Sequence, residues 1–320
     1  MTQLYVEGWA PEYGSPYEAD DDLADPDKVD ESVEEAGPWE PRPGHDDGVD
    51  RIAFVDGVRR IDARLMLETE NGPVPGICGS FGVGAVVWDR SIPRSDLTHA
   101  RVERLAVFGH GTAAPVPSAD DLIRYRSVSV PDQDAGALIQ RFHGEMRKAE
   151  GELSEEIARE GTFVIADGPL NDLSATEKVG YVKTHRAPYL SPGTAPVVGR
   201  LKAAERTPLF LIGAGTPYPR YSWYLRLASV LGGHSWSGVV RAEVSSHLPL
   251  DHAARIADRT TALLPAVASE PHVDPRAPQN LVPIGALEKD LRRRLGDPGF
   301  IYRSLRSAVK RATVAAEGAA

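Results

Sequence analysis

Two short apolar runs stand out in the pattern of hydrophobic and polar positions along the chain. They cover Ile52–Val55 and Phe163–Ala166, and each is followed directly by an aspartate and then a glycine. A run of four apolar residues that stops at a turn residue is typical of a strand buried on both faces. The pattern therefore predicts two buried strands that end at Asp56 and at Asp167.

The first run opens a region of strand-like alternation, which glycines and short polar turns divide. This predicts an antiparallel meander of four strands. Their expected bounds are residues 51–58, 61–70, 77–88 and 101–108. After the second run, further strands are expected at residues 179–184, 208–213, 221–231 and 237–244.

Apolar residues recur at a spacing near 3.6 residues from residue 132 to residue 160, with charged residues between them. That period predicts a long amphipathic helix, which leads into the second Asp-Gly run. Similar patterns predict helices at residues 250–267, 283–295 and 300–315. Together these elements favour an α/β fold with a mixed sheet flanked by helices, built as a single domain.

Composition sets limits on this picture. With 320 residues, 42% of them hydrophobic, the chain can build one large domain or two small ones. It has no stretch of ~20 uninterrupted apolar residues, and its amino terminus lacks the basic and apolar regions of a signal peptide. We therefore expect a cytoplasmic protein with no membrane contact. The single cysteine, Cys78, excludes an internal disulfide and is interpreted as a core residue.

Charge is distributed unevenly. Residues 1–50 hold 16 acidic and two basic side chains, whereas residues 51–320 hold 30 acidic and 34 basic ones. The segment from Glu18 to Asp50 is rich in Asp, Glu, Pro and Gly, which predicts a largely disordered acidic arm over residues 1–50. The arm would serve solubility, or it would compete with DNA for the mildly basic body or dock onto a partner.

The two aspartates are the main candidates for chemistry. A carboxylate buried at the end of an apolar strand is costly unless a divalent cation, a basic side chain or backbone amides meet it. The alternative is that each Asp-Gly pair is only a strand-ending turn. Motifs of other enzyme classes are absent: the chain has no Gly-Lys-Ser/Thr phosphate loop, no Gly-x-Ser-x-Gly elbow and no His-Glu-x-x-His helix.

The long predicted helix offers a third carboxylate. Glu150 lies close to its apolar stripe and is its most inward glutamate. Two aspartates on neighbouring strand ends and a helix glutamate would form an oxygen-rich cage of the kind that holds Mg²⁺ or Mn²⁺. Such cages serve phosphoryl chemistry.

A polar stretch follows the second aspartate. Strand alternation would place Tyr181, Lys183 and His185 on one face. These side chains suit a bound phosphate, with Lys183 as a point charge and His185 as a proton carrier or hydrogen-bond donor. An exposed polar strand face is the alternative.

The order of these motifs resembles that of a known family. Phe-Val-Asp-Gly-Val, Ala-Asp-Gly-Pro-Leu and Val-Gly-Tyr-Val-Lys-Thr-His, with Trp223–Leu227 and Val240–Glu243 after them, resemble the NurA nucleases. The resemblance runs from about residue 51 to about residue 295. It implies a ribonuclease H-like core and a manganese-dependent nuclease that acts on DNA single strands and duplex ends. It also implies a dimer that works with the hexameric HerA ATPase in end resection.

Carried over by position, the resemblance implies metal ligands. Asp56 and Asp167 match the aspartates of the first and second family motifs. Glu150 is the best match for the helix glutamate, with Glu145 or Glu152 in its place if the helix register differs by a turn. We accordingly divide the chain into the acidic arm, a nuclease domain and a basic carboxy-terminal helix or tail, over residues 1–50, 51–297 and 298–320.

The remaining candidates concern the substrate and one departure from the family. Lys183 matches the family's lysine and would contact the scissile phosphate, while Tyr181, Arg226 and Tyr224 are candidate DNA contacts. Tyr224 would stack on a splayed base, although aromatic residues at strand spacing are more often core residues. Glu288 stands where the family often has a histidine on a late helix. It can still ligate a hard cation, although the change affects metal preference or activity.

Basic residues crowd the carboxy-terminal region and would either track DNA phosphates or form a solvated helix face. They are Arg292, Arg293, Arg294, Arg303, Arg306, Lys310 and Arg311. The sequence as a whole thus predicts a Mn²⁺- or Mg²⁺-dependent DNA nuclease on a ribonuclease H-like α/β fold. Two alternatives stay open: a catalytically silent DNA-binding or adaptor subunit of a motor ATPase, and a metal-dependent phosphatase or nucleotide hydrolase.

Overall fold

The computed structural model describes residues 29–92, 94–118, 123–132, 134–170, 174–184, 189–216 and 218–317. The chain forms two compact units rather than the single domain expected from the sequence. The first unit comprises residues 1–55, 86–96 and 151–286, and the second comprises residues 56–85, 97–150 and 287–320. The strand and helix patterns run through these boundaries without a linker, so the sequence carries no mark of the division.

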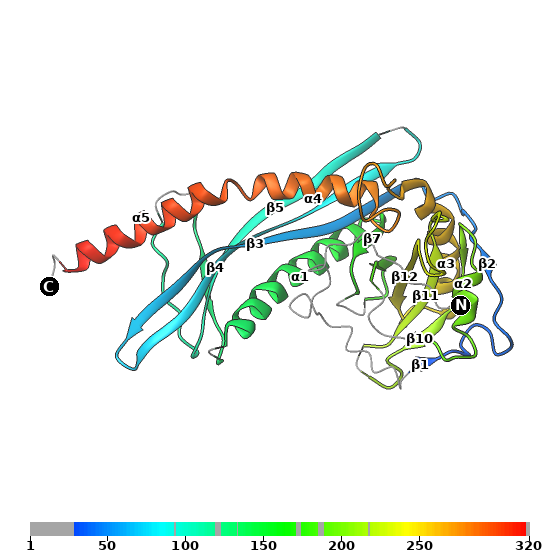
Figure 1. The fold of residues 1–320 in the computed structure, drawn as a ribbon, viewed down its shortest axis with the longest axis horizontal. Helices are drawn as coiled ribbons and strands as arrows, with labels where there is room; N and C mark the ends of the chain where they lie inside the picture. The colour runs from blue at the N-terminus through cyan, green and yellow to red at the C-terminus, as the bar shows by residue number, and fades with distance from the viewer. Residues whose placement is uncertain are drawn as a thin grey trace. The chain divides into compact units, whose positions relative to one another are not determined.

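The strands of the described chain belong to one mixed sheet (Figure 1). The order along its main path is β1-β10-β11-β12-β8-β7-β3-β4-β5-β6, and β2 and β9 pair beside that path. The bounds are β1 Val29–Asp30, β2 Arg42–Pro43, β3 Arg51–Thr69, β4 Gly72–Asp89, β5 Arg94–Phe108, β6 Arg126–Ser129, β7 Phe163–Asp167, β8 Lys178–Val182, β9 Glu205–Arg206, β10 Phe210–Ile212, β11 Arg220–Arg226 and β12 Val239–Ser245.

In the first unit, β7 pairs in parallel with the start of β3 and with β8, whereas β8, β12, β11 and β10 pair antiparallel. This confirms the predicted mixed sheet. Its helices are α2 (Pro196–Arg200) and α3 (Leu250–Leu263), with the 3₁₀ helix η2 (Leu264–Val267) directly after α3. Phe54, Ile165 and Trp223 lie in the core of this unit and are almost inaccessible to solvent.

The second unit contains most of the long β3–β4–β5 meander, the larger parts of α1 (Ala135–Arg159) and α4 (Val282–Arg294), and the whole of α5 (Pro298–Glu317). The helix α1 approaches β4 closely: a Cβ atom on Gly79 would lie 2.5 Å from the Phe142 ring. Only glycine leaves room for that contact. Cys78 is buried in the same unit, as expected for a core residue. Burial, followed by the nearby Asp62 carboxylate, raises the pKa of the Cys78 thiol to about 12, so the thiol is a poor nucleophile.

The meander has three long strands instead of the four expected. β3 runs unbroken from Arg51 to Thr69, so no turn separates residues 51–58 from residues 61–70. Asp56 therefore lies inside a strand and not at its end. Gly57 does not adopt a positive φ angle, unlike Gly168, which has a φ of 90° directly after Asp167. Only the second Asp-Gly pair ends its strand.

Residues 29–50 correct the prediction of a disordered arm. Val29 in β1 pairs with Ile212 in β10, and Trp39 is buried with its ring 6.1 Å from that of Phe210. Arginines of the first unit neutralise the acidic groups of this segment. The ion pairs are Glu34–Arg206, Asp46–Arg90 and Asp47–Arg259. Residues 1–28 lie outside the described part of the chain.

The helix predicted over residues 300–315 is present in the structure, where α5 covers residues 298–317. Among the described residues, no helix combines the length and the apolar character that a membrane span needs.

Candidate functional site

Asp56 is held in β3 with 8% of its surface exposed. Its Oδ1 accepts a hydrogen bond of 2.7 Å from the backbone N–H of Gly57. A backbone amide therefore meets one oxygen of this buried carboxylate, which is one of the ways in which the cost of its burial can be reduced.

Glu150 lies against the residue that follows Asp56. A Cβ atom added to Gly57 would stand 2.1 Å from Glu150 Oε1, so the carboxylate of Glu150 fills the space that a side chain at position 57 would need. Both residues belong to the second unit. The other helix glutamates differ: Glu145 forms ion pairs with Arg126 and Arg141, and Glu152 is exposed. The structure thus favours Glu150 over these alternatives.

Gly57→Ala should displace the Glu150 carboxylate, because no Cβ atom tolerates a neighbour at 2.1 Å. We expect at least a tenfold loss of Mn²⁺ affinity, of the size seen when groups that support metal ligands are altered. Titrating Mn²⁺ into the variant and the parent checks this. Gly144→Ala on α1, the helix that carries Glu150, is the control, because its Cβ atom would meet nothing within 4 Å. Equal affinities for Gly57→Ala and the parent would show that Glu150 is not part of a metal site.

Glu288, on α4, is also buried in the second unit. Its Oε2 forms an ion pair of 3.2 Å with Arg292, one helical turn further along. A ligand oxygen of Glu288 lies within 4.8 Å of one of Asp56. Glu288 is therefore positioned beside Asp56.

Asp167 ends β7 in the first unit and has a basic partner. Lys183, which follows β8 and is buried, places its Nζ 2.6 Å from Asp167 Oδ2 and 2.9 Å from Asn280 Oδ1. The sequence predicted that Lys183 contacts a phosphate. In the structure its ammonium group instead contacts a carboxylate and an amide oxygen.

The carboxylate of Asp274 orients Asn280. Asn280 Nδ2 donates to Asp274 Oδ2 over 2.6 Å, and Arg276 donates to the same carboxylate from its backbone N–H and its side chain. Partial burial alone would raise the pKa of Asp274, but the hydrogen bonds from Arg276 and Asn280 lower it to about 2. Sequence analysis missed Asp274 and Asn280, because neither lies in a motif and their connection to Lys183 spans about 90 residues of chain.

The lowered pKa of Asp274 predicts a pH dependence of stability. Because its folded pKa lies below the ordinary value of 3.8, its contribution is present above about pH 4 and is lost as the pH falls toward about 2. Asp274→Asn removes that contribution. The difference in melting temperature between parent and variant should therefore be largest above pH 4 and shrink toward pH 2. A difference that stays constant over this range would contradict the assignment.

The strand register brings the two aspartates to neighbouring positions. In the parallel ladder of β3 and β7, Val55 pairs with Ala166, and Asp56 and Asp167 are the next residues of their strands. Within the second unit, ligand oxygens of Asp56 and Glu288 lie within 4.8 Å of one another. Oxygen ligands of this kind suit hard divalent cations. The pair could contribute to holding a metal ion.

Three predicted substrate contacts are core residues instead. Tyr181 is fully buried and its hydroxyl donates to the Gln279 carbonyl oxygen over 2.6 Å. Tyr224 stacks on Phe210, and Arg226 donates to backbone carbonyl oxygens, among them Leu201 O over 2.6 Å. Alternation predicted the face of Tyr181, whereas Tyr224 and Arg226 were candidates from the stretch Trp223–Leu227, but β8 and β11 are buried on both faces. His185 lies outside the described residues.

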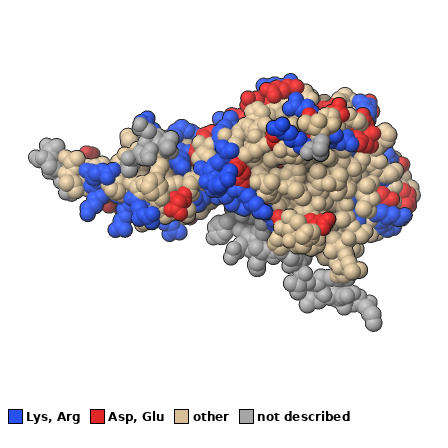
Figure 2. Space-filling model, turned by 90° about the horizontal axis from the view of Figure 1, so that it is seen from above, with Lys and Arg blue, Asp and Glu red and all other residues tan. Residues whose placement is uncertain are grey.

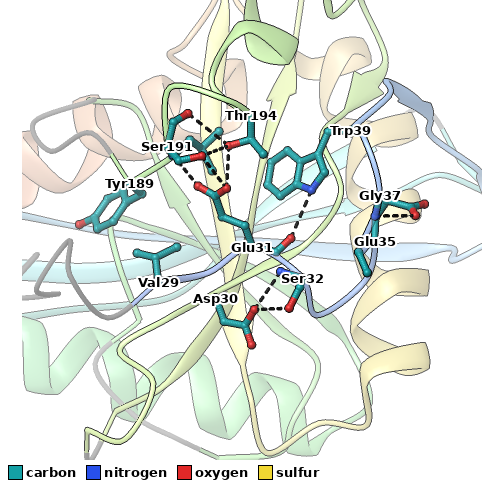
Figure 3. A pocket seen from close by; sticks show the side chains of 12 residues that line it. Val29, Asp30, Glu31, Ser32, Glu35, Gly37, Trp39, Tyr189, Ser191 and Thr194 are labelled. Atoms are coloured by element: carbon teal, nitrogen blue, oxygen red, sulfur yellow. Dashed lines mark hydrogen bonds between the residues drawn. The ribbon is translucent and has the colours of Figure 1, made fainter.

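The first unit also contains a pocket of about 600 Å³ (Figure 3). It lies between residues 29–39 and 189–194, and no lysine or arginine is among its described lining residues. Figure 3 shows Glu31 directed at Ser191 and Thr194, whose hydroxyl groups donate to its carboxylate over 2.9 Å each. With Asp30 and Glu35 also in the lining, the pocket carries the wrong charge for a phosphate.

Comparisons with known proteins give a limited result. No protein-family model matches the sequence, and no curated protein matches it. Among solved structures, the chain is similar to the crystal structure of the NurA nuclease from Sulfolobus solfataricus, with 11% sequence identity and a TM-score of 0.45. The match covers 80% of this chain and 84% of that one. At this level of similarity, function has to be derived from the side chains.

Proposed function

We propose that the chain is a metal-dependent DNA nuclease that hydrolyses phosphodiester bonds. The observation that carries the proposal is the pair of buried carboxylates Asp56 and Glu288 in the second unit, whose oxygens lie within 4.8 Å of one another. Their formal charge of −2 is one that a single divalent cation would balance. The order of the sequence motifs that resemble the NurA nucleases supports the same reading.

In this proposal Asp56, Glu150 and Glu288 hold Mn²⁺ or Mg²⁺, and the family resemblance adds Asp167 as a ligand. A bound cation would activate water and neutralise charge on the phosphodiester. The ammonium group of Lys183, 2.6 Å from Asp167 Oδ2, directs this carboxylate. Asn280 contacts the same ammonium group and is itself held by Asp274. The phosphate contact predicted for Lys183 would be made beside these contacts or in place of one of them.

Four further properties are proposed from the family resemblance alone. They are a ribonuclease H-like core, action on single strands and duplex ends in break processing, a homodimer, and assembly with a HerA-like hexameric ATPase. Light scattering of the purified chain tests the dimer, and co-migration with such an ATPase in size-exclusion chromatography tests the assembly. A monomer that never co-migrates with the ATPase would contradict the last two properties.

The decisive experiment measures cleavage of single-stranded and duplex DNA with Mn²⁺, with Mg²⁺ and with EDTA. We expect cleavage that needs the metal and disappears in Asp167→Asn. Bis(p-nitrophenyl) phosphate and p-nitrophenyl phosphate serve as small competing substrates. If the monoester is turned over faster than DNA, the chain is a phosphatase and the nuclease proposal is wrong.

A second candidate is a catalytically silent DNA-binding or adaptor subunit. The ion pair of 2.6 Å between Lys183 and Asp167 favours it, because an ammonium group beside a carboxylate can substitute for a metal ion. The same assays separate the two candidates. A silent subunit would bind DNA with equal affinity with or without Mn²⁺ and would cut neither DNA nor the small diester.

A further inference from the structure

The helix α5 carries basic charge that no acidic group of the described chain balances. Arg303, Arg306, Lys310 and Arg311 lie within 298–316, a stretch without a single acidic residue. None of the four forms an ion pair within 4.0 Å among the described residues, and all four are exposed. Figure 2 shows Lys and Arg side chains gathered over the carboxy-terminal part of the chain.

The neighbouring helix α4 provides the contrast. Its three consecutive arginines, Arg292, Arg293 and Arg294, all pair with carboxylates of their own helix. Basic residues near a helix end are common, and pairing of this kind is the ordinary outcome. Helix α5 departs from it, although the arginines of both helices belong to the second unit.

The unpaired charges form a stripe. Arg303, Arg306 and Lys310 stand at positions i, i+3 and i+7, which share one face of a helix and span about 10 Å along it. The opposite face packs into the core through Ile301, Leu305 and Ala308. From Val309 to Ala315 every described side chain is exposed. The stripe therefore faces solvent directly away from the buried face.

Like charges three and four residues apart destabilise a helix. The arrangement is therefore unfavourable in the isolated protein and becomes favourable beside a polyanion with closely spaced charges. Each DNA strand carries one phosphate charge per 3.4 Å of helix axis. From this charge complementarity we propose that the α5 stripe binds the phosphate backbone of the DNA substrate. The inference rests on the proposed function for the identity of the substrate.

Paired variants with equal charge changes test this. Arg306→Gln with Lys310→Gln removes two unpaired charges, whereas Arg293→Gln with Arg294→Gln removes two that are already paired. Affinity for a single-stranded oligonucleotide is measured in EDTA at several KCl concentrations. We expect the α5 variant to bind about tenfold more weakly and to lose about 1.4 from the slope of log K against log salt. The α4 variant should change less than twofold.

Without DNA, the α5 variant should also melt at a higher temperature than the parent, because the substitutions remove repulsion between like charges. A stripe that only stabilised the folded protein would give the opposite result. Equal losses of affinity in both variants would overturn the proposal. So would unchanged DNA binding with a lower molecular mass in light scattering, since the stripe would then contact a second copy of the chain.

Failure of this inference and failure of the proposed function can be distinguished. Metal-dependent hydrolysis of bis(p-nitrophenyl) phosphate, which is too small to reach along α5, should be unchanged in the α5 variant. If the parent cleaves this diester while both charge variants bind DNA with equal affinity, only the proposal for the α5 stripe is wrong. If the parent never cleaves but α5 governs binding, the nuclease proposal alone is wrong.

Discussion

Asp56→Asn should lower metal-dependent DNA cleavage about a thousandfold or more and, at the same time, raise the melting temperature of the metal-free protein. Both effects have one cause. Asp56 and Glu288 are buried carboxylates of the same unit with oxygens within 4.8 Å of one another. Without a cation the two carboxylates repel each other. A cation held between them would stabilise charge in the reaction by several kcal/mol.

Thermal melts with and without Mn²⁺ separate these effects from general damage. A ligand at about 100 times its dissociation constant stabilises the folded state by about 2.7 kcal/mol, so Mn²⁺ should raise the melting temperature of the parent. Asp56→Asn should lose most of that rise. Glu70→Gln is the control, because it makes the same chemical change in the exposed turn after β3. A metal-free variant that melts lower than the parent, with its Mn²⁺ response intact, would refute the site.

Arg206→Ala should destabilise the protein by about 3–5 kcal/mol, the usual cost of removing one partner of a buried ion pair. The Arg206 side chain is 1% exposed and donates to both oxygens of Glu34 at 2.9 Å and to Asp258 at 2.7 Å. Burial alone would raise the pKa of Glu34, but Arg206 holds it below its ordinary value. Without the guanidinium group, Glu34 keeps only Arg42, which is partly exposed, and the backbone N–H of Leu209 as partners.

Urea unfolding measures this cost, and proteolysis within residues 29–50 shows whether the segment detaches. Arg200→Ala is the matched control, because its ion pair with Glu40 is exposed and should contribute less than about 1 kcal/mol. Arg206→Met combined with Glu34→Leu should recover most of the loss, since apolar pairs often replace buried ion pairs without cost. A single variant as stable as Arg200→Ala would show that the pair does not anchor the segment.

The sequence predicted those features that depend on neighbouring residues. The apolar period of α1 and the buried runs at the start of β3 and in β7 are local, and the structure has them. Long-range partners decided the rest. Gly57 looked like a turn residue because nothing nearby in the sequence shows that Glu150 fills its side-chain space. The acidic segment looked disordered because its arginine partners lie up to 212 residues away.

The residues of the candidate site differ in the same way, according to whether neighbouring residues or distant ones decide their environment. Asp56, Asp167 and Lys183 stand in short motifs, and Glu288 was proposed from the resemblance to the NurA nucleases, so sequence reasoning could propose them. Alternation placed Tyr181 on one face with Lys183, yet the strand on which Tyr181 lies is covered on both faces. Alternation assigns a side chain to a face of its strand, but only the packed sheet shows whether that face meets solvent.

The unbroken course of β3 limits how this chain can change during evolution. Asp56 lies within a continuous extended strand, where side chains alternate with a period of two. An insertion or deletion of one residue before position 56 would turn the carboxylate to the opposite surface and would also shift Gly57 away from Glu150. Descendants of this chain should therefore vary near the catalytic candidate by substitution and keep the spacing from Arg51 to Gly57 constant.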